Sequence, residues 1–197
     1  MRRSSVVCVL MITLLLSACG GAGEDNGPLE QALAIRGEYL AAAGCTARLD
    51  VTADYGQRVY TYTVDVTASD GCTALQVVAP EEVAGFTAYL DGAQGSLEYN
   101  GAVLETGELS SDGLTPLSAV PAMLETARSG FIADCTREML GERETVRVQC
   151  HDPAAQPGNG RESTLWFDAD SHVLLRGEIS VDGRRAITCE FSEFALE

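Results

Sequence analysis

The stretch CTARLDVTADYGQRVYTYTVDVTASDG, residues 45–71, decides the fold class of this 197-residue chain. Apolar and polar side chains alternate along it in two runs, which a short polar turn separates. A two-residue period places successive side chains on opposite faces of a β-strand. Each run therefore predicts a strand with one apolar and one polar face, as in an antiparallel sheet that is covered on one side. The apolar positions are Ala47, Leu49, Val51, Ala53 and Tyr55 in the first run and Tyr60, Tyr62, Val64 and Val66 in the second.

Turn dipeptides recur beyond this stretch and predict a series of hairpins. Asparagine–glycine and aspartate–glycine pairs tolerate the positive φ angles of two-residue hairpin turns. The clearest case is Asn100-Gly101, which stands between the short runs 97–99 and 102–104. The other pairs are Asp70-Gly71, Asp91-Gly92, Asp112-Gly113 and Asp182-Gly183. Later strands are expected at residues 131–140, 145–152, 163–167, 173–181 and 186–194.

Two segments with helical spacing interrupt the strands. Pro28 opens the first, which continues to about residue 43. The second covers residues 118–130, where Ser118 is the expected N-cap, Pro121 belongs in the first turn and Gly130 ends the helix. Because an antiparallel sheet of about ten strands must curl or close, its apolar face needs a cover.

These elements predict an α+β fold in a single domain, residues 28–197. We expect a strongly curved antiparallel sheet, an incomplete β-barrel of about 10–11 strands, covered by the N-terminal helix and the mid-chain helix. The two helices could fill the interior or leave an apolar cavity between themselves and the sheet.

The N-terminus has the pattern of an export signal. Arg2 and Arg3 precede an apolar run from Val6 to Leu16, which is too short to span a bilayer. The run ends in Leu16-Ser17-Ala18-Cys19, which resembles a bacterial lipobox and implies diacylglycerol, with palmitate-type acyl chains, on the sulfur of Cys19. We expect a lipoprotein signal peptide at residues 1–18 and a flexible spacer at 19–27. The alternative is an ordinary signal peptide cut near Ala18.

Charge and export define the expected surroundings of the protein. The formal net charge is −16, and removal of the two positive charges of Arg2 and Arg3 makes it −18; every basic residue is arginine. Such a surface repels nucleic acid and anionic lipid headgroups. We therefore expect no nucleic-acid partner, contact with the membrane through the lipid anchor, and a location at the extracytoplasmic face of the cell membrane.

Five cysteines remain in the chain after Cys19. An exported protein can keep disulfides, and a predicted hairpin with its turn at residues 141–144 sets Cys135 opposite Cys150. Cys45 and Cys72, which begin predicted strands, form a second candidate pair. The alternative is that several of these cysteines are small buried apolar residues.

Recognisable catalytic and metal-binding motifs are missing from the sequence. It contains no GxSxG elbow, HExxH motif, P-loop or dinucleotide-binding glycine pattern. Asp168 and Asp170 have the spacing that begins a calcium loop, but its glycine and its bidentate glutamate are absent. We interpret His151 and His172 as loop and turn residues. No enzymatic activity, metal or cofactor is expected.

The order of these features resembles the LolA/LolB/LppX superfamily of bacterial envelope lipoproteins. The stretches that carry the resemblance are VVAPEEVAGFTAYLDGAQGSLEYNGAVL (77–104), SAVPAMLETARSG (118–130) and LWFDADSHVLLRGEI (165–179). The resemblance implies an incomplete β-barrel, closed by helices, with an apolar cavity for acyl chains. It also implies carriage of lipids or lipoproteins between membranes, or, in relatives from spore-forming bacteria, action through protein contacts.

Several residues are candidates for the lining of such a cavity. They come from the two alternating strands, the mid-chain helix and the 163–167 strand: Val51, Tyr60, Tyr62, Val64, Val120, Met123, Leu124 and Trp166. The alternative for each of them is a place in a solid core. Trp166 and Phe167 are neighbours on one strand and are expected on opposite faces.

The sequence favours an anchored protein that binds a lipid, an acyl chain or a lipoprotein in a half-barrel cavity. The alternative is a non-enzymatic scaffold or regulator of an envelope enzyme, which predicts a filled interior and an exposed apolar patch. A hydrolase has the least support, because no nucleophile–base pair is recognisable. A fixed anchor favours a stationary receiver or scaffold over a travelling carrier.

Overall fold

The computed structural model describes residues 27–69, 71–92, 94–108, 112–156 and 158–197. The predicted signal peptide and Cys19 lie outside the described residues. In chain order the elements are α2 (Gly27–Ala41), β1 (Gly44–Asp54), β2 (Val59–Ser69), β3 (Cys72–Ala79), the 3₁₀ turn η2 (Glu81–Val83), β4 (Thr87–Asp91), β5 (Gln94–Tyr99), β6 (Ala102–Glu108), α3 (Pro116–Ser129), β7 (Ile132–Leu140), β8 (Arg143–His151), β9 (Arg161–Asp168), β10 (Leu174–Val181) and β11 (Arg184–Leu196). Neither described helix is long and apolar enough to cross a bilayer.

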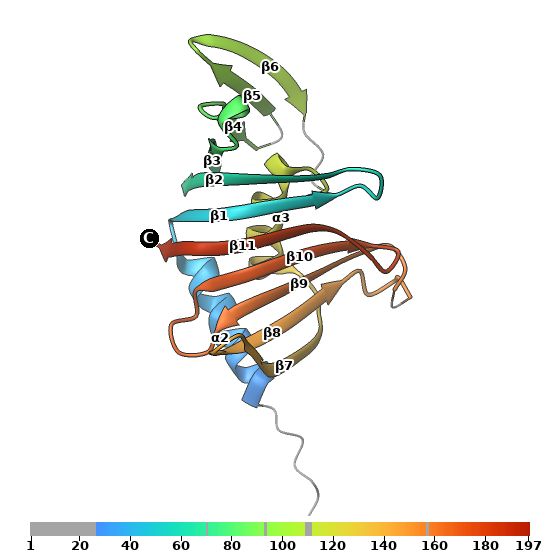
Figure 1. Ribbon diagram of the computed structural model, residues 1–197. Helices are drawn as coiled ribbons and strands as arrows, with labels where there is room; N and C mark the ends of the chain where they lie inside the picture. Colours follow the sequence, from blue (N-terminus) through green and yellow to red (C-terminus); the bar gives the residue numbers. More distant parts are fainter. Residues whose placement is uncertain (1–26, 70, 93, 109–111, 157) are drawn as a thin grey trace, which may run out of the picture.

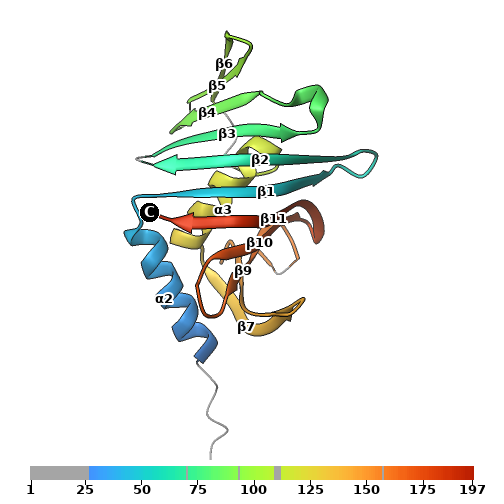
Figure 2. The same ribbon diagram turned by 60° about the vertical axis from the view of Figure 1, so that its left-hand side comes forward.

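All eleven described strands belong to one antiparallel sheet, whose order is β6-β5-β4-β3-β2-β1-β11-β10-β9-β8-β7. The six strands before α3 and the five after it each form a meander, and the pairing of β1 with β11 joins the two halves. The sheet curves around α2 and α3 and ends in the separate edges β6 and β7 (Figures 1 and 2). The predicted α+β architecture with an open, curved sheet is confirmed.

Among the described residues, hairpin turns lie where Asn100-Gly101 and Asp182-Gly183 predict them, and Asp112-Gly113 is an exception. Asp91 is still the last residue of β4, and Asp70 lies outside the described residues. Asn100 and Gly101 have φ angles of 50° and 78°, and Asp182 and Gly183 have 50° and 73°. The exception is Gly113, which precedes α3 instead of joining two strands. A side chain at Gly113 would collide with Ile179 and Ala122, so glycine allows this segment to pack closely against the core.

The start of α3 differs from the prediction. Thr115 is the N-cap, and Ser118 is the third helical residue of a capping box: Ser118 donates its backbone N–H to Thr115 Oγ1 over 3.2 Å, and Ser118 Oγ accepts from the Thr115 backbone over 3.3 Å. Pro116 occupies the first turn. Pro121 therefore lies inside the helix rather than in its first turn. Gly130 ends the helix as predicted, with its N–H bonded to the Thr126 carbonyl.

Helix α2 packs through its smaller apolar face. Ala32, Ile35 and Tyr39 are buried, whereas Leu29, Leu33 and Leu40 are 40%, 52% and 61% exposed. The three leucines share one side of the helix, because positions i, i+4 and i+11 fall within about 40° of each other at 3.6 residues per turn. The three leucines therefore lie on a different side of α2 from the residues that pack inward.

The two helices hold each other through arginine side chains. Arg36 of α2 donates to the carbonyl oxygens of Ala127 and Gly130 at the end of α3, over 3.3 and 2.5 Å. Arg128 of α3 donates to the Tyr39 carbonyl near the end of α2, over 2.9 Å. Each guanidinium thus satisfies carbonyl groups that a helix end leaves without partners. These reciprocal hydrogen bonds hold the two helices against each other where they pack on the sheet.

Asp168 organises the turn between β9 and β10. Its Oδ1 accepts from the backbone and hydroxyl of Ser171 over 2.9 and 3.0 Å and from the Asp170 backbone over 3.1 Å. The bond from the Ser171 backbone is the main cause that lowers the pKa of Asp168, and Arg143 adds electrostatic attraction. A lowered folded pKa stabilises the protein above the ordinary aspartate value, and this contribution is lost as the pH falls through the folded pKa.

We therefore expect Asp168→Asn to lower the free energy of unfolding by about 1 kcal/mol at pH 7. The difference from the wild type should shrink below about pH 4 and vanish at lower pH, because both side chains are then neutral. Thermal unfolding of both proteins between pH 3 and 7 measures this. Asp170→Asn, a change at an exposed carboxylate in the same turn, is the control and should have little effect. A constant difference between wild type and Asp168→Asn across this range would contradict the assignment.

Candidate ligand-binding face

The inner face of the sheet, defined as the face that packs against the helices, carries a continuous apolar row. Directly paired residues in neighbouring strands point to the same face of a sheet. The registers of β1 to β6 align one such row, whose members are Ala47, Val66, Leu75, Ala88, Leu97 and Leu104. Leu75 and Ala88 are 1% and 2% exposed, Leu97 is half-buried, and Leu104 at the edge is 64% exposed. The row therefore begins in the core and ends in solvent.

The position of the helices explains this gradient. They pack mainly on β1, β7, β8, β9 and β11. Strands β5 and β6 extend beyond them (Figure 1), so the inner face of these strands remains apolar without a helical cover. We call this part of the inner face the open apolar face; it consists of Phe86, Leu97, Tyr99 and Leu104.

Aromatic rings contribute to the inner face of this half of the sheet. The rings of Phe86 and Tyr99 are stacked, with centroids 4.0 Å apart. Tyr60 and Tyr62 stack at 6.5 Å on the inner face of β2, and Tyr55 contacts Tyr60 at 6.2 Å. The Tyr55 hydroxyl donates to the Leu114 carbonyl over 3.0 Å. Tyrosine combines a large apolar ring with a polar tip, which suits the rim of a binding face.

Most of the predicted lining residues lie together, deep in the core. Five of them are at most 3% exposed and belong to one contiguous cluster: Val51, Val64, Val120, Met123 and Leu124. Tyr62 packs partly buried against this cluster. Tyr60 is 37% exposed at the β1–β2 hairpin end of the same face. Leu124 also borders a surface pocket of about 440 Å³ between the helices.

Trp166 lies apart from the other predicted residues, on the outer face. Its Nε1 donates to Glu138 Oε1 over 2.5 Å, and the Arg176 guanidinium lies 5.6 Å from the ring centroid. Glu138 is also 3.3 Å from Arg147, and Arg176 pairs with Glu178 at 2.6 Å. Phe167 points inward with 2% exposure, so the two neighbours face opposite sides as expected. The structure does not bring Trp166 into the core with the other candidates.

No disulfide joins Cys135 and Cys150 in the structure. The turn between β7 and β8 contains two residues rather than the predicted four, which places Cys135 opposite Val148 and Cys150 opposite Ile132. Burial raises the pKa of the Cys150 thiol to about 11, so it remains protonated at neutral pH. Cys45 and Cys72 do not pair either, because the register of β1 to β3 puts them on opposite faces.

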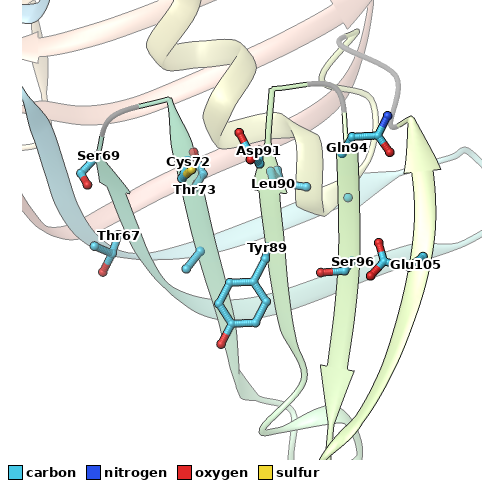
Figure 3. A pocket seen from close by; sticks show the side chains of 12 residues that line it. Thr67, Ser69, Cys72, Thr73, Tyr89, Leu90, Asp91, Gln94, Ser96 and Glu105 are labelled. Atoms are coloured by element: carbon cyan, nitrogen blue, oxygen red, sulfur yellow. The ribbon is translucent and has the colours of Figure 1, made fainter.

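A groove of about 400 Å³ lies on the outer face of β2 to β6 (Figure 3). Tyr89, 46% exposed, lies among hydroxyl and carboxylate side chains there. The groove is bordered by Thr67, Ser69, Cys72, Thr73, Ala74, Tyr89, Leu90, Asp91, Gln94, Gly95, Ser96 and Glu105. It has two carboxylates and no cation, so its charge disfavours anions. Sequence reasoning missed this groove; its one signal was an aromatic residue, Tyr89, at a position where the alternation requires an outward side chain.

Each of the two histidine rings lies close to an oxygen atom of another residue. His172 Nδ1 lies 2.8 Å from Glu38 Oε1, and the His172 carbonyl accepts from the Tyr39 hydroxyl over 3.3 Å. His151 Nδ1 lies 2.8 Å from the Asp152 carbonyl oxygen. Within the described part of the chain, no three metal-binding side chains of histidine, cysteine, aspartate or glutamate are grouped so that they could hold a metal ion.

Comparison with known proteins gives similarities in structure alone. No family model matches the chain, and no curated protein matches it. A conserved protein of Thermus thermophilus is 9% identical with a TM-score of 0.50, over 86% of this chain and 87% of that one. The lipoprotein LppX of Mycobacterium tuberculosis is 16% identical with a TM-score of 0.48, over 87% and 96%. A LolA superfamily protein of Nitrosomonas europaea is 13% identical with a TM-score of 0.40, over 84% and 93%.

These likenesses concern the fold. The order of helix, six-strand meander, helix and five-strand meander is the one expected from the resemblance to the LolA/LolB/LppX superfamily. The predicted similarity in fold is therefore confirmed.

Proposed function

We propose that this chain is an extracytoplasmic lipoprotein, anchored to the cell membrane through Cys19, that binds a lipid or an acylated protein segment on the inner face of its sheet. The observation that carries the proposal is the apolar row that leaves the core and reaches solvent at Leu104, which is 64% exposed. An apolar surface on the concave side of a sheet, bordered by aromatic rings, is a frequent form of ligand site.

The core beneath this face supplies its floor. Val64 and Leu75 are at most 2% exposed and lie on the strands that lead to the open apolar face. An acyl chain that lies along Leu97 and Leu104 would extend the apolar core past the part of the sheet that the helices cover. The chain would gain about 0.8 kcal/mol for each CH₂ group that it buries. Val51, Val120 and Met123 are fully buried in the contiguous core, so the proposed ligand would lie on the open apolar face beside this core and not among these three residues.

The proposed anchor restricts where the protein can act. Eight residue steps separate Cys19 from Gly27, where α2 begins. A fully extended chain spans at most about 3.6 Å per residue, so the start of α2 stays within roughly 30 Å of the leaflet. This reach favours reception or transfer of a ligand at one membrane over transport between two.

Native mass spectrometry tests the proposal on the full chain, purified from cell membranes in a maltoside detergent. We expect a mass increment of one lipid in addition to the covalent anchor. Leu104→Glu should lower the bound fraction at least tenfold, because it removes about 1.5–3 kcal/mol of apolar contact and adds a carboxylate.

The matched control is Val103→Glu on the same strand. Val103 is 62% exposed, almost as much as Leu104, but it pairs with Glu98 on the outer face. This variant should bind as the wild type does. An equal loss of bound lipid in both variants would contradict the proposal. A wild-type chain that carries no lipid besides its anchor would contradict it as well.

One observation favours a second candidate function, a non-enzymatic scaffold or regulator of an envelope enzyme. The leucines at positions 29, 33 and 40 of α2 form an exposed apolar stripe that no described element covers. Such a stripe fits a groove in a partner protein or the membrane interface. In the same mass spectra, a complex with a second protein in place of the lipid increment would favour this function.

A further inference from the structure

Arg161, the first residue of β9, is a half-buried cation with unsatisfied hydrogen-bond donors. Its side chain points to the inner face, as do Ser163 and Leu165 on the same strand, which are 4% and 0% exposed. Its Nε and Nη2 atoms are buried and have no hydrogen-bond partner. Arg36 and Arg128, the arginines that hold the helices, each donate to main-chain carbonyl oxygens instead. Arg161 therefore keeps donors that the fold does not use.

The surroundings of Arg161 make this arrangement costly. Burial lowers the pKa of the guanidinium, and attraction to Asp112 opposes this shift only in part. The segment before α3 closes over it, since a side chain at Gly113 would lie 3.7 Å from Nη2. A buried charge without hydrogen bonds is unfavourable unless a partner compensates it. Buried polar groups without partners are rare in folded proteins, which points to a partner that comes from outside the chain.

A pocket next to Arg161 has room for such a partner. It measures about 210 Å³ and lies between the end of α3 and the ends of β8 and β9. Thr126 and Ser163 border it with hydroxyl groups, and Phe131, 53% exposed, forms an apolar wall beside His151. Asp152 contributes a carboxylate, so Arg161 is the cation of this lining and Asp152 its anion.

The chemistry of a guanidinium selects the class of ligand. Its planar N–H groups match the two oxygens of a carboxylate or a phosphate, and such charge-assisted bonds are the strong ones. The outer groove carries Asp91 and Glu105 and no cation, so an anion has no comparable place there. We infer that the pocket at Arg161 binds an anionic group, a carboxylate or a phosphate, as a site separate from the open apolar face. Phe131 offers apolar contact to whatever carries the anion.

Titration calorimetry of three probes with the full chain and two variants, in maltoside, tests this inference. The probes are inorganic phosphate, octanoate and its uncharged analogue octanamide, and the variants are Arg161→Met and Arg184→Met. Arg184 is exposed at the start of β11 and does not line the pocket, so its replacement removes the same charge elsewhere. We expect octanoate or phosphate to bind the wild type and the Arg184→Met variant, and to lose at least tenfold in affinity in Arg161→Met.

The probes distinguish the sources of the anion. If phosphate is the one probe that binds, and its binding is lost in Arg161→Met, the result supports a site for a free anion. Octanoate binding tenfold more tightly than octanamide, with the difference lost in Arg161→Met, supports it for a lipid headgroup. Equal affinities of octanoate and octanamide, together with no phosphate binding, overturn the inference and leave the proposed lipid-binding function standing. If none of the three probes binds, the inference fails, and the native mass spectra decide the proposed lipid-binding function separately.

Thermal unfolding separates a binding role from a structural one. Because Nε and Nη2 of the guanidinium have no hydrogen-bond partner in the ligand-free protein, Arg161→Met should melt at the same or a higher temperature than the wild type. A clear drop in its melting temperature would assign Arg161 a structural role and overturn the inference. Addition of phosphate should raise the melting temperature of the wild type and not that of Arg161→Met.

Discussion

Replacing Tyr39 by alanine is expected to lower the free energy of unfolding by about 3–5 kcal/mol. Tyr39 is fully buried at the point where α2 meets the sheet. Its ring meets Phe167 edge-on at 5.3 Å and stacks on Phe194 at 5.8 Å, so it joins β9 to β11 beneath the helix. Since domains have about 5–15 kcal/mol of stability in total, this one change removes a large share of it.

Chemical denaturation monitored by circular dichroism measures the effect of Tyr39→Ala, and two variants separate its causes. Tyr39→Phe keeps the ring and removes only the bond from the hydroxyl to the His172 carbonyl, so it should cost about 1 kcal/mol. Leu40→Ala, at the adjacent exposed position, should change stability by at most about 0.5 kcal/mol. A loss below about 1 kcal/mol for Tyr39→Ala would mean that α2 is not docked on the sheet as described.

Replacing Cys19 by serine is expected to remove the protein's acyl chains and with them its stable attachment to the membrane. Lipid chains bind a bilayer by about 0.8 kcal/mol for each buried CH₂, and stable anchoring needs two such signals. The chain offers no electrostatic substitute, because its net charge is −16 and it has no lysine. The wild type should therefore remain with membranes after a wash in high salt.

Metabolic labelling with an alkyne fatty acid and fractionation of membranes measure both effects of Cys19→Ser. The expected result is loss of the label and of most membrane association in this variant. Cys8→Ser, within the apolar run that the cut removes, serves as the control and should keep both. A Cys19→Ser chain that still carries the label would show that the lipid is attached elsewhere.

Short-range patterns predicted most of the fold correctly. Alternation along residues 45–71 and the turn dipeptides gave β1 and β2 and the Asn100 hairpin, because side-chain period and positive φ angles are local properties. The wrong local predictions concerned the residue that caps a helix and the side of a helix that packs inward. Thr115 rather than Ser118 caps α3, and in α2 both sides of the helix carry apolar residues, so periodicity could not decide which side packs inward.

The sequence predicted the candidate site less well than it predicted the fold. In Leu165-Trp166-Phe167 all three side chains are apolar, so the pattern shows that neighbours alternate but not which face is inside. Similarly, a difference of two residues in the β7–β8 turn moved Cys135 away from Cys150. Arg161 gave no signal in the sequence, because its lack of hydrogen bonds results from segments that meet it from elsewhere in the chain.

The sequence by itself determined the class of fold, the order of its elements and the acidic, lysine-free composition, and it predicts the export signal. The tertiary structure decided that β1 pairs with β11, that the helices stop short of β5 and β6, and that Nε and Nη2 of Arg161 are buried without a hydrogen-bond partner. The physical reason is range: hydrogen-bonded turns and side-chain periods are set by neighbours in the chain, whereas coverage and burial depend on residues that folding brings together from distant parts of the chain, as it does β1 and β11.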